Sequence, residues 1–295
     1  MLYLNKYLIE RDGGMMKKIV LITGILTILI AISAVFFYRV NAEGKLNKQK
    51  YIQSTTPTLF FHGYGSSANA ERHMTNAAKK AGVTNTIIRA NVDRNGQVTL
   101  KGKIPKGAIN PIVEVNYEDN RNPNKVSQYA KAVVTKLQQT YGFKKMNMVG
   151  HSLGNMSILY YLLEYGQDES LPQLQKQVNI ANFAAGLQVM GVSSDLKVDE
   201  KTGKPNQTSA IFQKLLGLRE IFPQKQIDVL NIYGDYKNGS DGSVLNAASR
   251  ALKYLVADNA KSYQEKKITG ALAQHSKLHE NPEVDKILIQ FLWGK

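Results

Sequence analysis

A serine set between two glycines is the feature of this sequence best suited to chemistry. The segment GHSLG covers residues 150–154, with Ser152 at its centre. It follows the apolar stretch KMNMV and precedes NMSILYYLL, so we expect a buried strand to pass directly into a buried helix at the serine. Such a sharp reversal needs very small neighbours, which explains Gly150 and Gly154. The serine hydroxyl would then stand exposed beside the helix N-terminus, where it could act as a nucleophile.

A serine needs a base to take its proton, and the chain has five histidines. His151 is inside the reversal and cannot reach its neighbour in the required geometry. His275 and His279 lie in AQHSKLHEN, between the last expected strand and the last expected helix, which places them at the same sheet edge as Ser152. We predict His275 as the base, because it comes first after the strand, and His279 as a capping or surface residue.

The base in turn needs a carboxylate to orient it. The segment IYGDYKNGSDGSV follows an expected strand and offers Asp235 and Asp241. Either could simply serve as a turn or helix-capping residue. We predict Asp241, because Asp241-Gly242 comes just before the next helix, and the order along the chain is then serine, aspartate, histidine.

Two backbone amides could stabilise the negative charge that develops on a substrate oxygen. One should belong to Leu153, the residue after the nucleophile. The other should come from a loop after an earlier strand, and HGYGSS (62–67) is such a loop, with Tyr64 N–H as the predicted donor. The glycines at 63 and 65 would let substrate approach this backbone, although HGYG could also be no more than a flexible turn.

Strand-like and helix-like segments alternate through the rest of the chain. Expected strands cover 58–63, 85–92, 97–104, 110–117, 145–150, 178–185, 227–234 and 263–270. Expected helices cover 68–82, 124–142, 155–166, 246–257 and 281–293. This alternation predicts an α/β fold, with a mostly parallel central sheet and helices on both faces. Residues 187–225 interrupt it, either as a small lid insertion over the site or as a plain surface excursion.

The N-terminal 42 residues predict export. Lys17 and Lys18 precede the uncharged apolar run 19–37, which is long enough to span a bilayer, and small residues follow at 40 and 42. This pattern fits a signal peptide that is cleaved or a membrane anchor that is retained, and the sequence leaves both open. A translation start at Met15 or Met16 in place of Met1 is also open. The basic residues predict that residues 43–295 face outward, at the cell surface or secreted.

The exported part divides into a polar tether, residues 43–54, and one domain, residues 55–295. The chain has a net charge of +15, of which residues 1–42 account for +3, so residues 43–295 carry +12. Its basic residues are scattered without a run of five, so we expect an envelope-facing basic surface and no nucleic-acid binding. The absence of cysteine excludes disulfides, thiolate metal sites and a cysteine nucleophile. We expect no metal and no cofactor.

The blocks LFFHGYGSSANAERHM, MNMVGHSLGNMS, GSDGSV and HSKLHENPEVDKILIQFLW resemble the cell-surface α/β-hydrolases of low-GC Gram-positive bacteria, a group without known function. They also resemble small bacterial lipases. The resemblance covers roughly residues 55–295. It implies the α/β-hydrolase fold, with Ser152 as nucleophile, His275 as base and Asp241 as acid.

These observations together predict a serine hydrolase that cleaves a small acyl-ester or lipid-like substrate. Transfer of the acyl group to an alcohol in the envelope is an alternative with the same chemistry. A non-catalytic envelope-binding protein is an alternative from another class. The natural substrate, the acyl length and the oligomeric state are not predicted.

Overall fold

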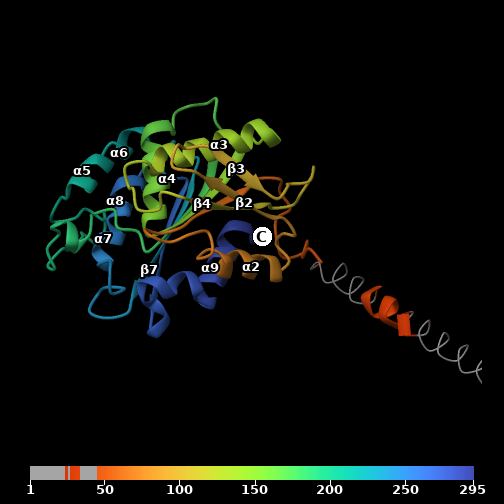
Figure 1. The fold of residues 1–295 in the computed structure, drawn as a ribbon. Coiled ribbons are helices and arrows are strands. Elements are labelled where there is room, and N and C mark those ends of the chain that lie inside the picture. The colour runs from red at the N-terminus through yellow and green to blue at the C-terminus, as the bar shows by residue number, and fades with distance from the viewer. Residues whose placement is uncertain (1–23, 26, 34–44) are drawn as a thin grey trace, which may run out of the picture. The chain divides into compact units, whose positions relative to one another are not determined.

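The computed structural model describes residues 24–25, 27–33 and 45–295, and the chain divides into two compact units, 1–45 and 46–295 (Figure 1). In the first unit, residues 24–25 and 27–33 are helical. The apolar run 19–37 and the export signal predicted over residues 1–42 lie largely outside the described residues, so they remain predictions. In the described part of the chain, no helix has the length and hydropathy needed to cross a membrane.

The second unit is built on one sheet of eight strands in the order β3-β2-β4-β1-β5-β6-β7-β8. Neighbouring strands are parallel except β2 and β3, which form the expected antiparallel hairpin. The strands are β1 (Thr58–Phe61), β2 (Ile87–Val92), β3 (Val98–Lys101), β4 (Ile112–Tyr117), β5 (Lys145–His151), β6 (Gln173–Ile180), β7 (Asp228–Asp235) and β8 (Ser262–Thr269). The predicted mostly parallel sheet is confirmed.

Helices cover both faces of this sheet (Figure 1). The helices are α2 (Arg72–Lys80), α3 (Val126–Tyr141), α4 (Leu153–Tyr165), α5 (Ala210–Leu215), α6 (Leu218–Ile221), α7 (Asn246–Arg250), α8 (Leu252–Val256) and α9 (Pro282–Trp293). One hydrophobic core lies under α3, α4 and the helices of residues 210–256, and a second lies under α2 and α9. Each face of the sheet is therefore buried against its own helical layer.

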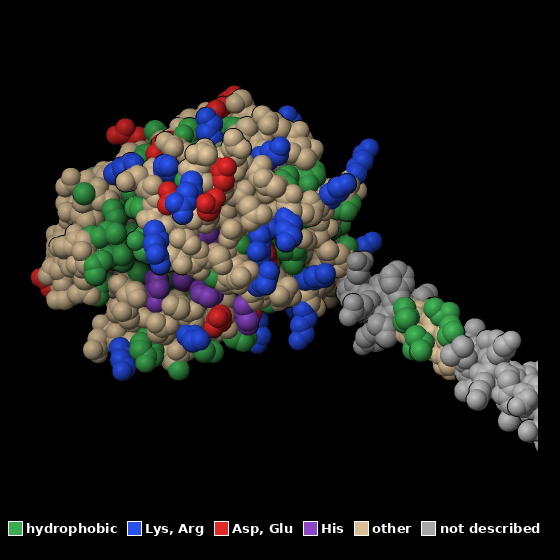
Figure 2. All heavy atoms as spheres, viewed as in Figure 1, with side chains coloured by type: hydrophobic (Ala, Val, Ile, Leu, Met, Phe, Trp, Pro, Cys, Tyr) green, Lys and Arg blue, Asp and Glu red, His purple; other side chains and the backbone are tan. Residues whose placement is uncertain are grey.

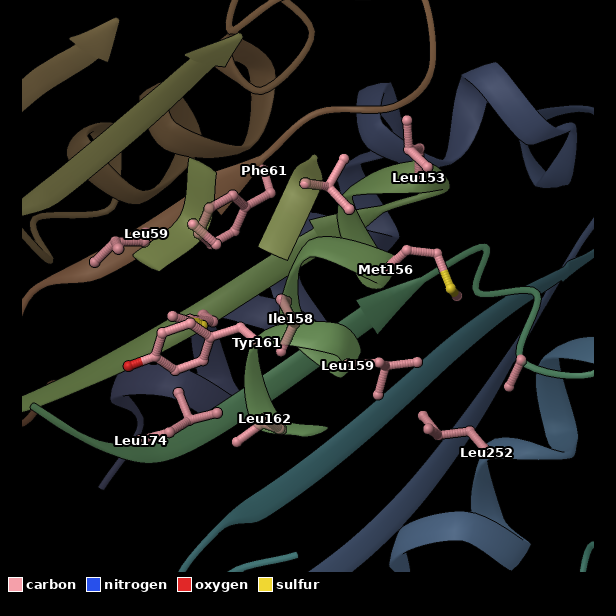
Figure 3. Close-up of a cluster of buried hydrophobic side chains, with 14 of the residues drawn as sticks. Leu59, Phe61, Leu153, Met156, Ile158, Leu159, Tyr161, Leu162, Leu174 and Leu252 are labelled. Atoms are coloured by element: carbon pink, nitrogen blue, oxygen red, sulfur yellow. The ribbon is translucent and has the colours of Figure 1, made fainter. Parts of the chain in front are cut away.

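Helix α4 is apolar on nearly all sides because it is enclosed by protein. Figure 3 shows its side chains, among them Met156, Leu159 and Leu162, between the sheet and neighbouring helices. All three are at most 1% exposed. Since α4 begins directly after Ser152, its burial fixes the position of the predicted nucleophile.

The sequence predicts a tether over residues 43–54, but the structure packs most of this segment against the domain. Tyr51 is buried and pairs with Gly294, while the Ile52 amide donates to the Trp293 carbonyl at 2.8 Å. Residues 46–54 therefore pack onto the C-terminal end of α9 and belong to the second unit. This stretch is mostly polar in sequence, but it contains one buried aromatic residue, Tyr51, whose partner Gly294 is far away in sequence.

Residues 187–225 are an excursion after β6, with a largely exposed first part and a helical second part that packs on the core. The expected strand at 178–185 stops at Ile180, because Ala181 takes a left-handed conformation with φ of 49°. A short turn, η1 (Gln188–Met190), follows and has no buried residue. The helical part beyond it buries Phe212 and Leu218 in the core shared with α4.

Candidate active site

Ser152 stands at a strained turn between β5 and α4. Its backbone has φ of 52° and ψ of −118°, an unusual conformation for a residue with a side chain. The glycines on either side leave no room for a Cβ. At Gly154 it would lie 2.0 Å from the Phe61 carbonyl oxygen, and at Gly150 it would lie 2.7 Å from the Asn155 nitrogen. The spacing GxSxG is therefore required by the close packing of three backbone segments at this turn.

The structure brings Ser152, His275 and Asp241 into one hydrogen-bonded chain. His275 Nε2 lies 3.0 Å from Ser152 Oγ, and His275 Nδ1 lies 2.8 Å from Asp241 Oδ2. The carboxylate can only accept, so Nδ1 carries the proton and Nε2 is free to accept from the serine hydroxyl. The residues come from three loops that follow β5, β7 and β8, whose carboxyl ends share one edge of the parallel sheet.

Asp241 is held so that one carboxylate oxygen remains for the histidine. Its side chain is 2% exposed, against 15% for that of His275. Its Oδ1 accepts from the amides of Ser243 at 2.9 Å and Val244 at 2.7 Å, which leaves Oδ2 for His275. The His275 amide also donates to the Asp241 carbonyl at 2.8 Å. The alternative acid, Asp235, instead accepts from the Gly239 amide and pairs with Lys267, so it serves as a turn residue.

The backbone amides of Tyr64 and Leu153 are the predicted oxyanion donors. Within the residues that the structure describes, neither Tyr64 N–H nor Leu153 N–H donates a hydrogen bond. Leu153 is the first residue of α4, and Gly63 lies so close that a Cβ there would be 3.2 Å from Ser152 Cβ. Two unused amide donors, one directly after Ser152 and one in the loop that approaches it, are what a developing oxyanion would need. Their role remains a prediction.

His151, which the sequence excludes as a base, has a structural role in the site that the sequence did not predict. It is buried, and its Nε2 donates to the His275 carbonyl at 3.0 Å. Burial lowers the pKa of His151 well below its usual range, so the ring is neutral. It also packs against the rings of His275 and His279, with centroids 5.1 and 4.7 Å away. His151 thus fixes the backbone that presents His275, through a hydrogen bond between positions 124 residues apart.

We expect His151→Phe to remove the hydrogen bond to the His275 carbonyl while keeping an aromatic ring of similar size. Loss of the donor to this half-buried carbonyl should lower the free energy of unfolding by about 1 kcal/mol. Misplacement of His275 should lower kcat for a soluble ester by roughly 10-fold. His151→Gln, whose amide can still donate, is the matched control and should retain most of the rate. Equal rates for the wild type and His151→Phe would contradict this role.

Gly234 is a second residue that the sequence analysis missed. A Cβ at this position of β7 would lie 2.0 Å from the Ala273 carbonyl oxygen and 3.0 Å from Asp241 Cβ. The loops carrying Asp241 and His275 therefore pack over Gly234, where the strand has no side chain. The signal in the sequence is the glycine that directly follows the strand-like stretch IDVLNIY, just before Asp235.

His62, His73 and His279 lie outside this hydrogen-bonded chain, although Figure 2 shows histidine side chains gathered on one face of the molecule. His62 lies 2.9 Å from the Gly63 carbonyl through Nδ1 and accepts from the Tyr117 amide at 3.1 Å through Nε2. His73 pairs with Asp285 at 3.1 Å. His279 is half-buried within the turn η3 (His275–Glu280). In the described chain, no three metal-binding side chains are grouped as ligands.

Comparisons with known proteins identify the fold and the family. The family model "alpha/beta hydrolase of unknown function (DUF915)" matches residues 45–295. The product of gene lin2722 from Listeria innocua has a solved structure with 26% identity and a TM-score of 0.71, and the match covers 81% of this chain and 94% of that chain. A candidate cell surface hydrolase from Lactobacillus plantarum WCFS1 has 19% identity and a TM-score of 0.64, with 80% and 89% covered. Among curated proteins, no significant match is found.

The structural likeness and the family match agree with the topology described above. The second unit has the mostly parallel sheet and the helical layers of an α/β hydrolase. The resemblance predicted from the sequence is confirmed, over a matched range, 45–295, in which Ser152, Asp241 and His275 all lie. The chain therefore belongs to the family of α/β hydrolases of unknown function.

Proposed function

We propose that this protein is a serine hydrolase that cleaves carboxylic esters, with Ser152 as nucleophile, His275 as general base and acid, and Asp241 as the orienting carboxylate. The single observation that supports this most is the continuous chain from Ser152 Oγ through His275 to Asp241, at 3.0 and 2.8 Å. The groups are already at hydrogen-bond distance, so no rearrangement is needed before the first proton transfer.

The proposed reaction has two halves. In the first, His275 Nε2 takes the Ser152 proton while Oγ attacks the ester carbonyl, and the imidazolium then gives this proton to the departing alcohol. In the second, His275 takes a proton from water, the hydroxide attacks the acyl-serine, and the carboxylic acid leaves as Ser152 recovers its proton. The Leu153 and Tyr64 amides hold the carbonyl oxygen as it becomes negative in both halves, and each donor is typically worth about 10²–10³-fold in kcat.

Asp241 keeps its charge through this cycle. Its two amide donors and its low exposure keep the carboxylate fixed opposite the imidazole. A fixed negative charge stabilises the imidazolium that forms when the proton arrives. From the N-terminal sequence we infer that this chemistry takes place outside the cytoplasmic membrane, at the cell surface or in secreted form.

A fluorophosphonate probe tests the proposed nucleophile directly. We expect one equivalent of probe per chain, and mass spectrometry should locate it on the peptide that contains Ser152. His275→Ala should slow the labelling by about 10³-fold or more, because the hydroxyl loses its base. His279→Ala, which removes a neighbouring imidazole outside the hydrogen-bonded chain, is the matched control and should label at close to the wild-type rate. An unlabelled protein, or labelling of another serine, would contradict the proposal.

A further inference from the structure

Most of the large apolar side chains that the second unit exposes lie at one edge of the sheet. In the described residues from 46 onward they are Ile52, Tyr64, Val189, Met190, Tyr236 and Leu272. All except Ile52 lie on loops that follow β1, β6, β7 or β8. Single exposed apolar residues are normal on any protein, but a gathering of them on one edge is informative.

These five residues, which we term the apolar rim, stand on both sides of Ser152. The strands β1, β5, β6, β7 and β8 are consecutive in the sheet and parallel, so their carboxyl ends lie at the same edge. Tyr64 follows β1 on one side of the serine, while Met190, Tyr236 and Leu272 follow β6, β7 and β8 on the other. At ~4.8 Å between strands, the rim spans roughly 19 Å along the edge, wide enough for several lipid headgroups.

Val189 and Met190 are adjacent exposed residues of the rim, and the backbone holds them in that position. Val189 is 91% exposed and Met190 is 52% exposed. They belong to η1, which is closed by hydrogen bonds from the Met190 amide to the Leu187 carbonyl at 2.9 Å and from the Gly191 amide to the Gln188 carbonyl at 3.0 Å. Leu187 packs on the core at the base of the turn. The turn therefore presents two apolar side chains to solvent on a fixed support.

Figure 2 shows hydrophobic side chains beside the histidines, with lysine and arginine side chains spread around them. Two cations beside the rim, Arg121 in the loop after β4 and Lys237 in the loop after β7, make no ion pair within the described residues. Arg121 lies against Gly65 in the Tyr64 loop, and Lys237 Nζ lies 5.3 Å from the Tyr236 ring.

The acidic groups of the same loops are largely engaged. Asp235 pairs with Lys267 and Glu280 pairs with Lys277, while Asp119 accepts a hydrogen bond from Asn122. Residues 43–295 carry a net charge of +12, which attracts the whole unit to a negative surface over a longer range. This arrangement is complementary to an anionic lipid surface in three ways. The rim has apolar side chains that can insert into the lipid layer, unpaired cations lie beside it, and the whole unit carries a net positive charge.

From this arrangement we infer that the apolar rim docks on a surface of anionic acyl-ester lipids, and that Ser152 acts on an acyl ester drawn from that surface. This inference rests on the proposed ester hydrolysis for its chemistry, and it names the substrate class as packed acyl lipids rather than freely dissolved esters. Docking of the rim would place the serine, which lies between its two sides, directly over the ester layer.

The first test compares two rates measured with the full chain. One is hydrolysis of a dissolved p-nitrophenyl butyrate, and the other is release of a fluorescent fatty acid from phosphatidylglycerol in vesicles with phosphatidylcholine. We expect Val189→Ser with Met190→Ser to lower the ratio of the vesicle rate to the dissolved-ester rate by about 10-fold, since two inserting side chains are lost. Ile52→Ser, which removes an exposed apolar side chain away from the rim, should leave this ratio within about twofold. An unchanged ratio in the double variant, or a wild type that cleaves only the dissolved ester, overturns the inference.

The second test separates docking from catalysis, using the absence of cysteine from the chain. An environment-sensitive fluorophore on Met190→Cys should shift to the blue when phosphatidylglycerol vesicles are added, and the shift should weaken in high salt. The same fluorophore on Gln264→Cys, an exposed position within β8, should not respond. A response at 190 without hydrolysis of either ester would retain docking and reject the proposed function. No response at 190 with hydrolysis of the dissolved ester would reject docking alone.

Discussion

Ser152→Ala is expected to lower kcat for a soluble short-chain ester by about 10⁴-fold or more, because the reaction loses the atom that forms the acyl-enzyme. The fold should survive, since the hydroxyl has one hydrogen-bond partner, His275, and alanine tolerates the turn about as well as serine does. KM should change little where it reports ground-state binding. Steady-state kinetics with p-nitrophenyl butyrate, with the melting temperature as a check on folding, measure the effect.

The decisive comparison is between single and double variants. If Ser152 and His275 work as one unit, His275→Ala should cost about as much as Ser152→Ala, and the double variant should cost no more than either, since triad effects are strongly non-additive. Ser193→Ala, at an exposed serine of the excursion after β6, should retain full activity. Activity of Ser152→Ala within 10-fold of the wild type would exclude the proposed nucleophile. Additive losses in the double variant would mean that His275 acts on something other than Ser152.

The sequence predicted the residues that meet at this site because a parallel sheet converts chain order into position. Ser152, Asp241 and His275 each follow the carboxyl end of a strand, and those ends lie along one edge. Once the strand–helix alternation is recognised, any polar residue just after a strand is a candidate for that edge. The glycines at 150 and 154 could be predicted for the same reason, since a strand that turns directly into a packed helix leaves no room for a side chain.

Features that depend on distant packing were not predictable from local pattern. The bond from His151 to the His275 carbonyl depends on how two loops 124 residues apart approach each other. Tyr51 lies in a polar stretch that predicts a tether, yet it is buried because residues 293–294 return beside it. In both cases one side chain makes a contact with a distant part of the chain, and the hydrophobic periodicity of its own segment does not indicate that contact.

Glu71 shows this limit most clearly, because nothing in ANAERHM distinguishes it from a surface residue. The structure buries it completely at the start of α2, and neither carboxyl oxygen has a hydrogen-bond partner within the described residues. Its neighbour Glu114 is bound by Arg89 at 2.9 Å and Thr75 at 2.8 Å, and so holds the stabilised negative charge. Burial, together with the charge of Glu114, raises the pKa of Glu71 from 4.5 to about 8.

Glu71→Gln is therefore expected to remove a pH-dependent loss of stability. In the unfolded chain Glu71 ionises near pH 4.5, whereas in the folded protein it keeps its proton to about pH 8. Folding thus takes up a proton between these values, and the free energy of unfolding of the wild type should fall by ~1.4 kcal/mol per pH unit from this group alone. The glutamine variant lacks this slope. It should match the wild type or lie slightly below it at pH 5, because its amide is buried without a partner, and exceed it by several kcal/mol above pH 8.

Urea unfolding at pH 5, 7 and 9 measures the difference between the two proteins at each pH, which cancels the titration of all groups that they share. Glu118→Gln is the matched control, because Glu118 is exposed and pairs with Arg94 on the surface, and its difference from the wild type should change little with pH. A difference for Glu71→Gln that stays constant from pH 5 to 9 would mean that Glu71 is ionised in the folded protein at pH 5. The carboxylate would then need a partner, and because the described residues provide none, that partner would have to be bound water or a cation.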